Sequence, residues 1–206
     1  MWVPGPDAPR TTALLSFTGA NPPRRSKRCS RPRNAAAPRR HEVIALTRSP
    51  QKLQLLRDLG AEAVLCDVYD SEALLDIAQR ARPETLVNFV TDLAARAAAA
   101  NHRARREGGA NLLKAATASG ASRLVVESVA FAVNGDAAQA VEELEQATRG
   151  FARAALILRF GRLWGPGTSY ETPPQPPTIH IEKAGAEAAR LLTHAPPATY
   201  IVTASQ

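Results

Sequence analysis

An unbroken apolar segment that runs straight into a glycine-rich turn constrains the fold of this chain more than any other feature. Residues 154–168 read AALILRFGRLWGPGT, with Arg159 at the end of the apolar run and Pro166 between two glycines. A continuous apolar run is typical of a strand buried on both faces of a parallel sheet. The glycines and the proline allow the chain to turn at the carboxyl edge of that sheet, where doubly wound folds bind ligands.

The remaining pattern alternates strands with helices. Strands are predicted at 42–47, 63–66, 85–90, 123–128, 155–160 and 199–203. Helices are predicted after Ser49, at 71–81, over an Ala-rich region that ends before Gly120, at 137–149 and at 182–194. Alternation of this kind requires right-handed crossovers and gives a mostly parallel sheet, so the predicted fold class is α/β.

The segment from Leu158 to Thr168 resembles the LRxGxxxGPGT motif of the extended and atypical short-chain dehydrogenases, the NAD-dependent epimerase/dehydratase family. The resemblance covers residues 41–206. It implies a Rossmann-like, doubly wound sheet with helices on both faces and an NAD(P) cofactor. It also implies that Thr12 to Phe17 forms the central strand, between the strands at 42–47 and 85–90.

Residues 1–40 form a basic segment rich in proline and arginine. The chain has a net charge of +7. Eight arginines and one lysine stand against Asp7 in this segment, so it carries +8 and the rest of the chain sums to 7 − 8 = −1. Thr18-Gly19-Ala20 resembles the start of the family's TGxxGxxG loop, but Pro22 and Arg25 stand where its later glycines are expected. The sequence therefore predicts an incomplete first βα unit.

Three interpretations of residues 21–40 remain open. Charge-rich, proline-rich composition without apolar periodicity is typical of an inert disordered segment, which a disturbed reading frame would also produce. A basic arm that binds nucleic acid is the second interpretation, although no aromatic residue interrupts the segment to stack on bases. An organellar transit peptide is the third, although the prolines disfavour its amphipathic helix.

Four residues are candidates for the cofactor site by this resemblance: Gly19, Arg48, Asp67 and Thr91. Arg48 follows the strand at 42–47, where an NAD enzyme would place an acid against the ribose hydroxyls and where a guanidinium can pair with a 2′-phosphate. Asp67 resembles the acid on the adenine side, and Thr91 ends a stretch that lines the nicotinamide side. The pattern favours NADP(H) over NAD(H), while the damaged glycine loop predicts weak binding.

The catalytic pattern is incomplete. Ser128 matches the family's catalytic serine, but no Tyr or Lys lies between Ser128 and Leu158, so the Tyr and Lys partners are absent. Tyr170 and His180 are the candidates in the substrate region, which is short. The sequence thus predicts an epimerase/dehydratase-like protein with impaired or no activity, and its status as an enzyme stays open. A non-catalytic NADPH-sensing or partner-binding module is the alternative.

Other classes of function find little support. Cys29 and Cys66 lack the spacing of a metal site or a disulfide framework, which fits a reducing, cytoplasmic setting. No apolar run approaches the roughly 20 residues that cross a bilayer. The expected partner is therefore a small-molecule substrate. No membrane partner is expected, and a nucleic acid is expected only if residues 21–40 act as a basic arm, which is the third function considered.

Overall fold

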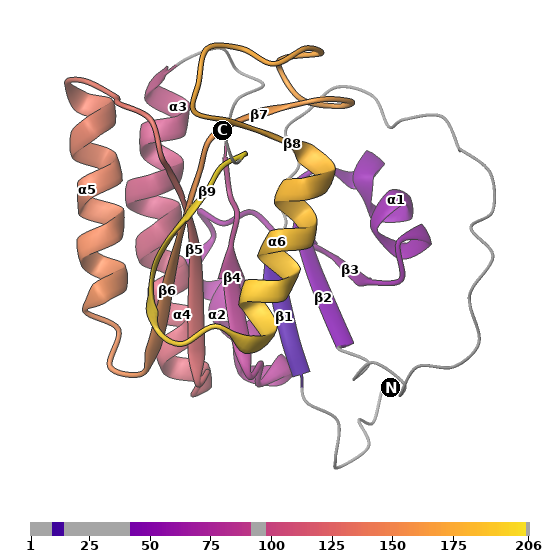
Figure 1. Cartoon of the computed structure of the whole chain (residues 1–206). Helices are drawn as coiled ribbons and strands as arrows, with labels where there is room; N and C mark the ends of the chain where they lie inside the picture. The colour runs from indigo at the N-terminus through magenta and orange to yellow at the C-terminus, as the bar shows by residue number, and fades with distance from the viewer. Residues whose placement is uncertain (1–9, 15–41, 92–97, 205–206) are drawn as a thin grey trace.

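The computed structural model describes residues 10–14, 42–91 and 98–204. These residues form a parallel sheet of seven strands in the order β3-β2-β1-β4-β5-β6-β9, flanked by helices (Figure 1). The strands are β1 Arg10–Leu14, β2 Glu42–Thr47, β3 Glu62–Leu65, β4 Thr85–Asn88, β5 Arg123–Val129, β6 Ala154–Phe160 and β9 Ala198–Val202. The predicted α/β class and the doubly wound, parallel architecture are confirmed.

Six α-helices connect these strands within the described residues. They are α1 Leu53–Asp58, α2 Ser71–Ala81, α3 Ala98–Arg103, α4 Gly109–Ser119, α5 Asp136–Arg149 and α6 Ile181–His194. A short 3₁₀ turn, η1 Pro50–Lys52, precedes α1, and a π-helical segment, η2 Ala104–Gly108, joins α3 to α4. No described helix is long and apolar enough to cross a membrane.

The first strand occupies the central position that the sequence predicts. β1 pairs in parallel with β2 on one side and with β4 on the other. Its bounds are Arg10–Leu14, so the strand begins two residues before Thr12, and residues 15–17 lie outside the described residues. The predicted absence of a first helix, and all three interpretations of residues 21–40, also lie outside them.

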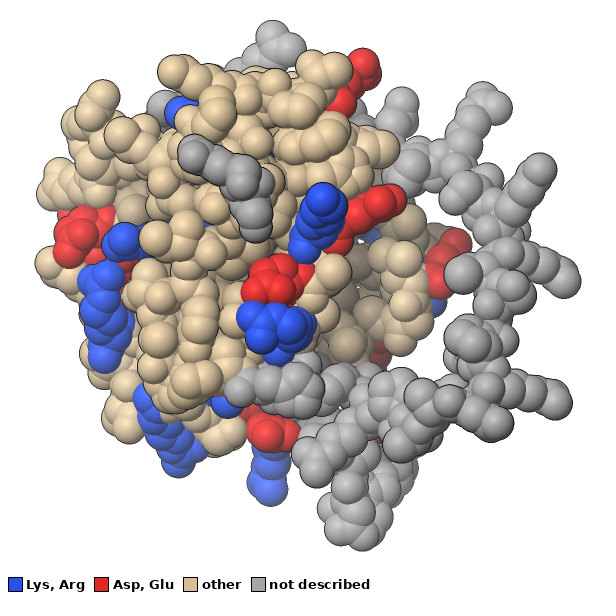
Figure 2. All heavy atoms as spheres, viewed as in Figure 1, with Lys and Arg blue, Asp and Glu red and all other residues tan. Residues whose placement is uncertain are grey.

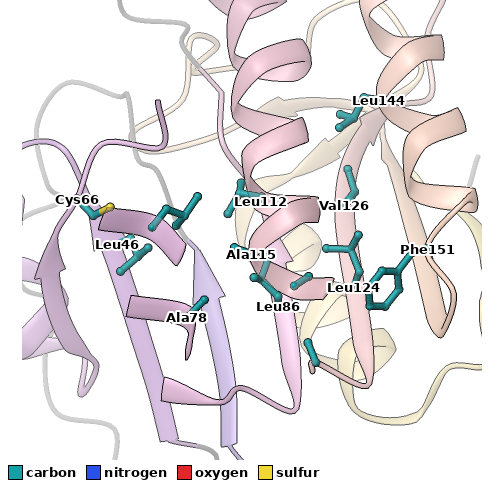
Figure 3. Close-up of a cluster of buried hydrophobic side chains, with 13 residues drawn as sticks. Leu46, Cys66, Ala78, Leu86, Leu112, Ala115, Leu124, Val126, Leu144 and Phe151 are labelled. Atoms are coloured by element: carbon teal, nitrogen blue, oxygen red, sulfur yellow. The ribbon is translucent and has the colours of Figure 1, made fainter. Parts of the chain in front are cut away.

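Two apolar cores fill the two sides of the sheet. On one side, α2, α4 and α5 pack against strands β2, β4 and β5 through a cluster that includes Leu74, Leu112, Leu144, Leu86 and Leu124 (Figure 3). The other side is covered by α6. Its cluster includes Ala184, Ala188, Leu191, Val87, Val125 and Leu158. Successive strand residues alternate between these cores, as Leu124 and Val125 do, because side chains point to opposite faces with a period of two.

Local signals place several helix ends where the sequence predicts them. The Asp70 carboxylate accepts a hydrogen bond from the backbone N–H of Ala73 and caps α2. Gly120 ends α4 with a φ of 75°, a left-handed conformation that glycine adopts without steric cost. Ser49 is the residue before η1, but its hydroxyl makes no capping bond and donates to Gln51 instead.

Beyond the main sheet, β7 Arg162–Trp164 and β8 Thr178–His180 form a two-stranded parallel sheet. This pair follows β6 and leads directly into α6. It holds the glycine-rich turn and the segment after it next to the carboxyl edge of the sheet, on the side that α6 covers (Figure 1).

Candidate cofactor and substrate site

The end of β2 places two cations side by side. Arg48 is exposed immediately after the strand, and Lys52 lies one turn further on. Burial lowers the pKa of Lys52, and the positive charge of Arg48 lowers it further. The turn between them is fixed because the Thr47 hydroxyl accepts a hydrogen bond from the N–H of Ser49 at 3.1 Å. An anionic group at this position would relieve the repulsion between the two cations.

The end of β3 is a tight polar turn. The Asp67 carboxylate accepts from the N–H of Tyr69 at 3.1 Å, and the Asp67 carbonyl accepts from the N–H of Asp70 at 3.0 Å. Cys66 is a buried free thiol, and burial together with the nearby Asp70 and Asp67 raises its pKa to about 11. It is therefore a poor nucleophile and a poor metal ligand. The described residues contain no cluster of His, Cys, Asp or Glu that suits a metal.

The end of β4 is shaped by close packing of the next helix. The Asn88 side chain accepts from the N–H of Val90 at 3.1 Å. A Cβ at Gly109 would lie 2.6 Å from Leu144 Cδ1 and 3.9 Å from Asn88 Nδ2, so a larger residue at that position would require the Leu144 side chain to move. Thr91 follows and is half-buried.

Ser128, the candidate catalytic serine, is held inside the fold. Its side chain is 1% exposed and its hydroxyl donates to Glu145 Oε1 at 2.6 Å. Glu145 lies on α5 and is fully buried. Arg159 donates to both of its carboxylate oxygens, at 2.8 and 2.5 Å, and Arg149 donates to Oε2 at 2.5 Å. The hydroxyl of Ser128 is thus committed to a buried network, which we call the Glu145 network.

Electrostatics keep Glu145 ionised within this network. Burial raises the pKa of the carboxyl group, but hydrogen bonds from Arg159 and Ser128, with the charge of Arg149, outweigh burial and leave the pKa below its ordinary value. Two arginines and a hydroxyl satisfy the carboxylate, so the cost of removing it from water is compensated. The arginine of the apolar segment that dominates the sequence is therefore a structural anchor for α5.

His180 and Tyr170 both lie beside the glycine-rich turn. His180 Nδ1 accepts from the N–H of Glu182 at 3.4 Å at the start of α6, and its ring packs against Trp164 with centroids 4.6 Å apart. A Cβ at Gly165 would lie 2.6 Å from His180 Nε2. Tyr170 is 45% exposed, and its backbone carbonyl accepts from the N–H of Gly165 at 2.8 Å. These contacts tie the turn to the start of α6.

Several polar residues near the carboxyl edge of the sheet were not predicted from the sequence. Glu145 stands in the run AVEELEQ, which carries four acidic or amide side chains that are typical of a solvated helix face. Only the position of Leu144 beside it shows that this side of the helix is buried. Lys52, Glu127 and Arg105 were missed as well. Gly19, which the sequence predicts for the cofactor site, lies outside the described residues.

The described residues fit a nicotinamide dinucleotide only on its adenosine side. Arg48, Lys52 and Asp67 stand at the ends of β2 and β3, where the ribose and adenine bind in doubly wound folds. The pyrophosphate loop falls outside the described residues. An open parallel sheet that carries polar groups at its carboxyl edge defines a Rossmann-type nucleotide-binding domain.

Comparison with protein-family models agrees with this assignment. The chain belongs to the NAD(P)H-binding family, whose model matches residues 33–160. A relative from a Streptomyces species, 3-diazoavenalumate denitrifying reductase, is 36% identical over 160 residues. The match covers 64% of this chain and 51% of the relative, so the chain spans about half of that protein's length.

Solved structures show the same fold at low identity. The Bordetella bronchiseptica enzyme WbmG in complex with NAD matches 80% of this chain and 65% of its own, with a TM-score of 0.64 and 16% identity. UDP-glucose 4-epimerase from Thermus thermophilus, also with NAD, matches 81% and 71%, with a TM-score of 0.64 and 14% identity. A dTDP-glucose 4,6-dehydratase from Bacillus anthracis, with NAD, matches 81% and 68%, at a TM-score of 0.64 and 11% identity. The resemblance to Rossmann epimerases and dehydratases is confirmed.

Proposed function

We propose that this protein binds NADP(H) and acts as a reductase that does not use the Tyr and Lys pair of the epimerases and dehydrogenases. The observation that carries the proposal is the Glu145 network. It occupies the hydroxyl of Ser128, and α5 carries neither Tyr nor Lys. Oxidation of an alcohol and epimerisation both need a base near the substrate oxygen, and these reactions are therefore expected to be impaired or absent.

Bound NADPH supplies a hydride. A reduction can proceed without a proton from the enzyme when the acceptor is strongly electrophilic. Replacement of a diazonium group by hydrogen is one such reaction, because the hydride forms the C–H bond and the C–N bonding electrons leave with N₂. The name of the Streptomyces relative, a denitrifying reductase of a diazo compound, supports this class for the present chain.

NADP(H) is favoured over NAD(H) because of the charge at the end of β2. Arg48 and Lys52 repel each other, and a 2′-phosphate between them would pair with both. No Asp or Glu directly follows β2 to accept hydrogen bonds from the ribose hydroxyls of NAD. The 2′-phosphate would therefore lie against these two side chains.

Titration calorimetry with NADPH and NADH tests the cofactor assignment. We expect Arg48→Ala to weaken NADPH binding about tenfold and to leave NADH unchanged, since one charge-assisted contact to the phosphate is lost. Arg57→Ala is the matched control, because Arg57 is an exposed arginine on the next helix. Equal affinity for the two nucleotides in the parent chain would contradict the NADP(H) preference.

Turnover assays separate a reductase from a non-catalytic module. NADPH oxidation with an aryl diazonium acceptor should be measurable, whereas NADP⁺ reduction with alcohols should not. The uncatalysed reaction of the same acceptor with NADPH is the necessary control. NADPH binding without any acceleration over that control would favour the sensing or partner-binding module instead.

The interpretation of residues 21–40 as a basic arm stays a prediction that the described residues do not test. On the face shown in Figure 2, the basic and acidic side chains of the described residues are interspersed. That arrangement supports a small-molecule partner for the folded part of the chain, rather than a polyanion.

A further inference from the structure

Glu127 places a carboxyl group on the face of the sheet that α6 covers. The side chains of β5 alternate between the two faces, since Val125 belongs to the core under α6 and Ser128 is bonded to Glu145 on α5. Glu127 directly precedes Ser128 and lies two residues after Val125, so its side chain points to the α6 side. It is paired in register with Leu158 of β6, near the end of the strand. A carboxyl group therefore stands in an apolar row, close to the edge where doubly wound folds bind ligands.

Two phenylalanine rings meet across β5 at this position. Phe89 follows β4 and Phe160 ends β6, and both belong to the apolar cluster on the α6 side. Because β5 lies between these strands, their backbones are about 10 Å apart, whereas the two ring centroids are 6.1 Å apart. The rings therefore lean toward each other over β5. The register pairs Asn88 with Val126. The next residues of the two strands, Phe89 and Glu127, are thus level with each other.

The surroundings of Glu127 make its ionised form costly. Burial raises the pKa of this carboxyl group from 4.5 to about 7, and the positive charge of Arg105 opposes the rise without cancelling it. Among the described residues, Arg105 is the charged group whose field acts on Glu127 in this way. Part of the Glu127 side chain is accessible, so a ligand can reach it. A cation beside the carboxylate would offset the cost of ionisation, and the neighbouring aromatic rings would attract the same cation.

We propose that Glu127, together with the rings of Phe89 and Phe160, binds an aromatic cation as the hydride acceptor at the carboxyl edge of β4 and β5. This inference rests on the proposed reductase function, because it names the class of acceptor for that site. An aryl diazonium ion is such a cation. Its positive charge disappears when N₂ leaves, so the neutral product would lose its attraction to the carboxylate and dissociate more readily than the substrate.

Calorimetry with N-methylpyridinium and toluene tests the inference on the full chain with saturating NADPH. The two probes have the same shape and differ by one positive charge. At pH 8 we expect N-methylpyridinium to bind about tenfold more tightly than toluene, and Glu127→Gln to abolish that difference, since the carboxylate is lost. Phe89→Leu should weaken N-methylpyridinium binding by about threefold, because the apolar contact remains without the ring. Glu62→Gln, at an exposed position of β3, is the control and should bind both probes as the parent does.

The pH dependence of binding separates a carboxylate that contacts the ligand from one that is merely structural. The ionised fraction of a group whose pKa is about 7 rises about tenfold between pH 6 and pH 8. The affinity for N-methylpyridinium should rise by about the same factor, because the cation binds the ionised form. The affinity for toluene should stay constant over this range, and Glu127→Gln should remove the pH dependence for the cation.

Failure of the inference and failure of the proposed function give different results. Equal binding of N-methylpyridinium and toluene to the parent at pH 8 would overturn the inference and leave the proposed function intact. Undiminished binding of the cation by a folded Glu127→Gln variant would do the same. Absence of NADPH binding in the parent would instead overturn the proposed function. Binding of N-methylpyridinium that depends on Glu127 in that case would support a cation site alone.

Discussion

The two halves of the sheet use their charged residues in opposite ways. At the ends of β2 and β3, Arg48 is exposed and Lys52 is only partly buried, with mutual repulsion between them. At the ends of β5 and β6, Arg159 and Ser128 are bound to the buried Glu145. The first arrangement places two positive charges close together, whereas the second pairs its arginines with a buried carboxylate. The comparison shows that residues such as Ser128 and Arg159 can match a catalytic motif and still be structural, and that their hydrogen-bond partners decide between the two roles.

The largest expected effect on stability comes from disrupting the Glu145 network. Glu145→Ala should lower the free energy of unfolding by about 3 kcal/mol, because it leaves the buried hydroxyl of Ser128 without its acceptor and removes two ion pairs whose arginines are partly exposed. Urea unfolding measures the change. Glu187→Ala is the control, since Glu187 pairs with Arg190 on the exposed surface of α6 and such pairs contribute at most about 1 kcal/mol. Equal losses in the two variants would show that the network carries no special stability.

The sequence predicted the regular elements far better than the contacts between them. The bounds of β2 and α2 agree with those predicted, because apolar periodicity and the cap at Asp70 are local signals. The short strands β7 and β8 were missed, since each has three residues and exists only by pairing with the other. Ser128 was assigned from its place at the end of a strand, whereas the acceptor of its hydrogen bond, Glu145, lies on a helix 17 residues later. No local pattern contains that information.

A second prediction concerns Glu127, a charged group on β5 that the Glu145 network does not include. Burial raises the pKa of Glu127 from 4.5 to about 7, and the charge of Arg105 only partly offsets this. The folded protein therefore binds more protons at this group than the unfolded chain does between those pH values. Stability is present in full at low pH and is lost as the pH rises toward 7.

Glu127→Gln should remove this dependence. At pH 8 the variant should be more stable than the parent by roughly 2–3 kcal/mol, and the difference should shrink toward pH 4.5. Urea unfolding of both proteins over this range tests it. Glu62→Gln, at an exposed position of β3, should show no such trend. A constant difference between parent and Glu127→Gln would mean that the carboxylate is already well solvated or paired in the folded state.

The smallest expected effect sharpens the comparison most, because it separates a structural serine from a catalytic one. Ser128→Ala removes one hydrogen bond to Glu145 while Arg159 and Arg149 remain bound to the carboxylate. The free energy of unfolding should fall by about 1 kcal/mol, a typical value for one buried hydrogen bond. NADPH affinity and the rate of acceptor reduction should not change, since the hydroxyl is buried and already bound to Glu145. If reduction is lost while stability is retained, the hydroxyl leaves Glu145 during turnover and Ser128 has the catalytic role that its position in the sequence predicts.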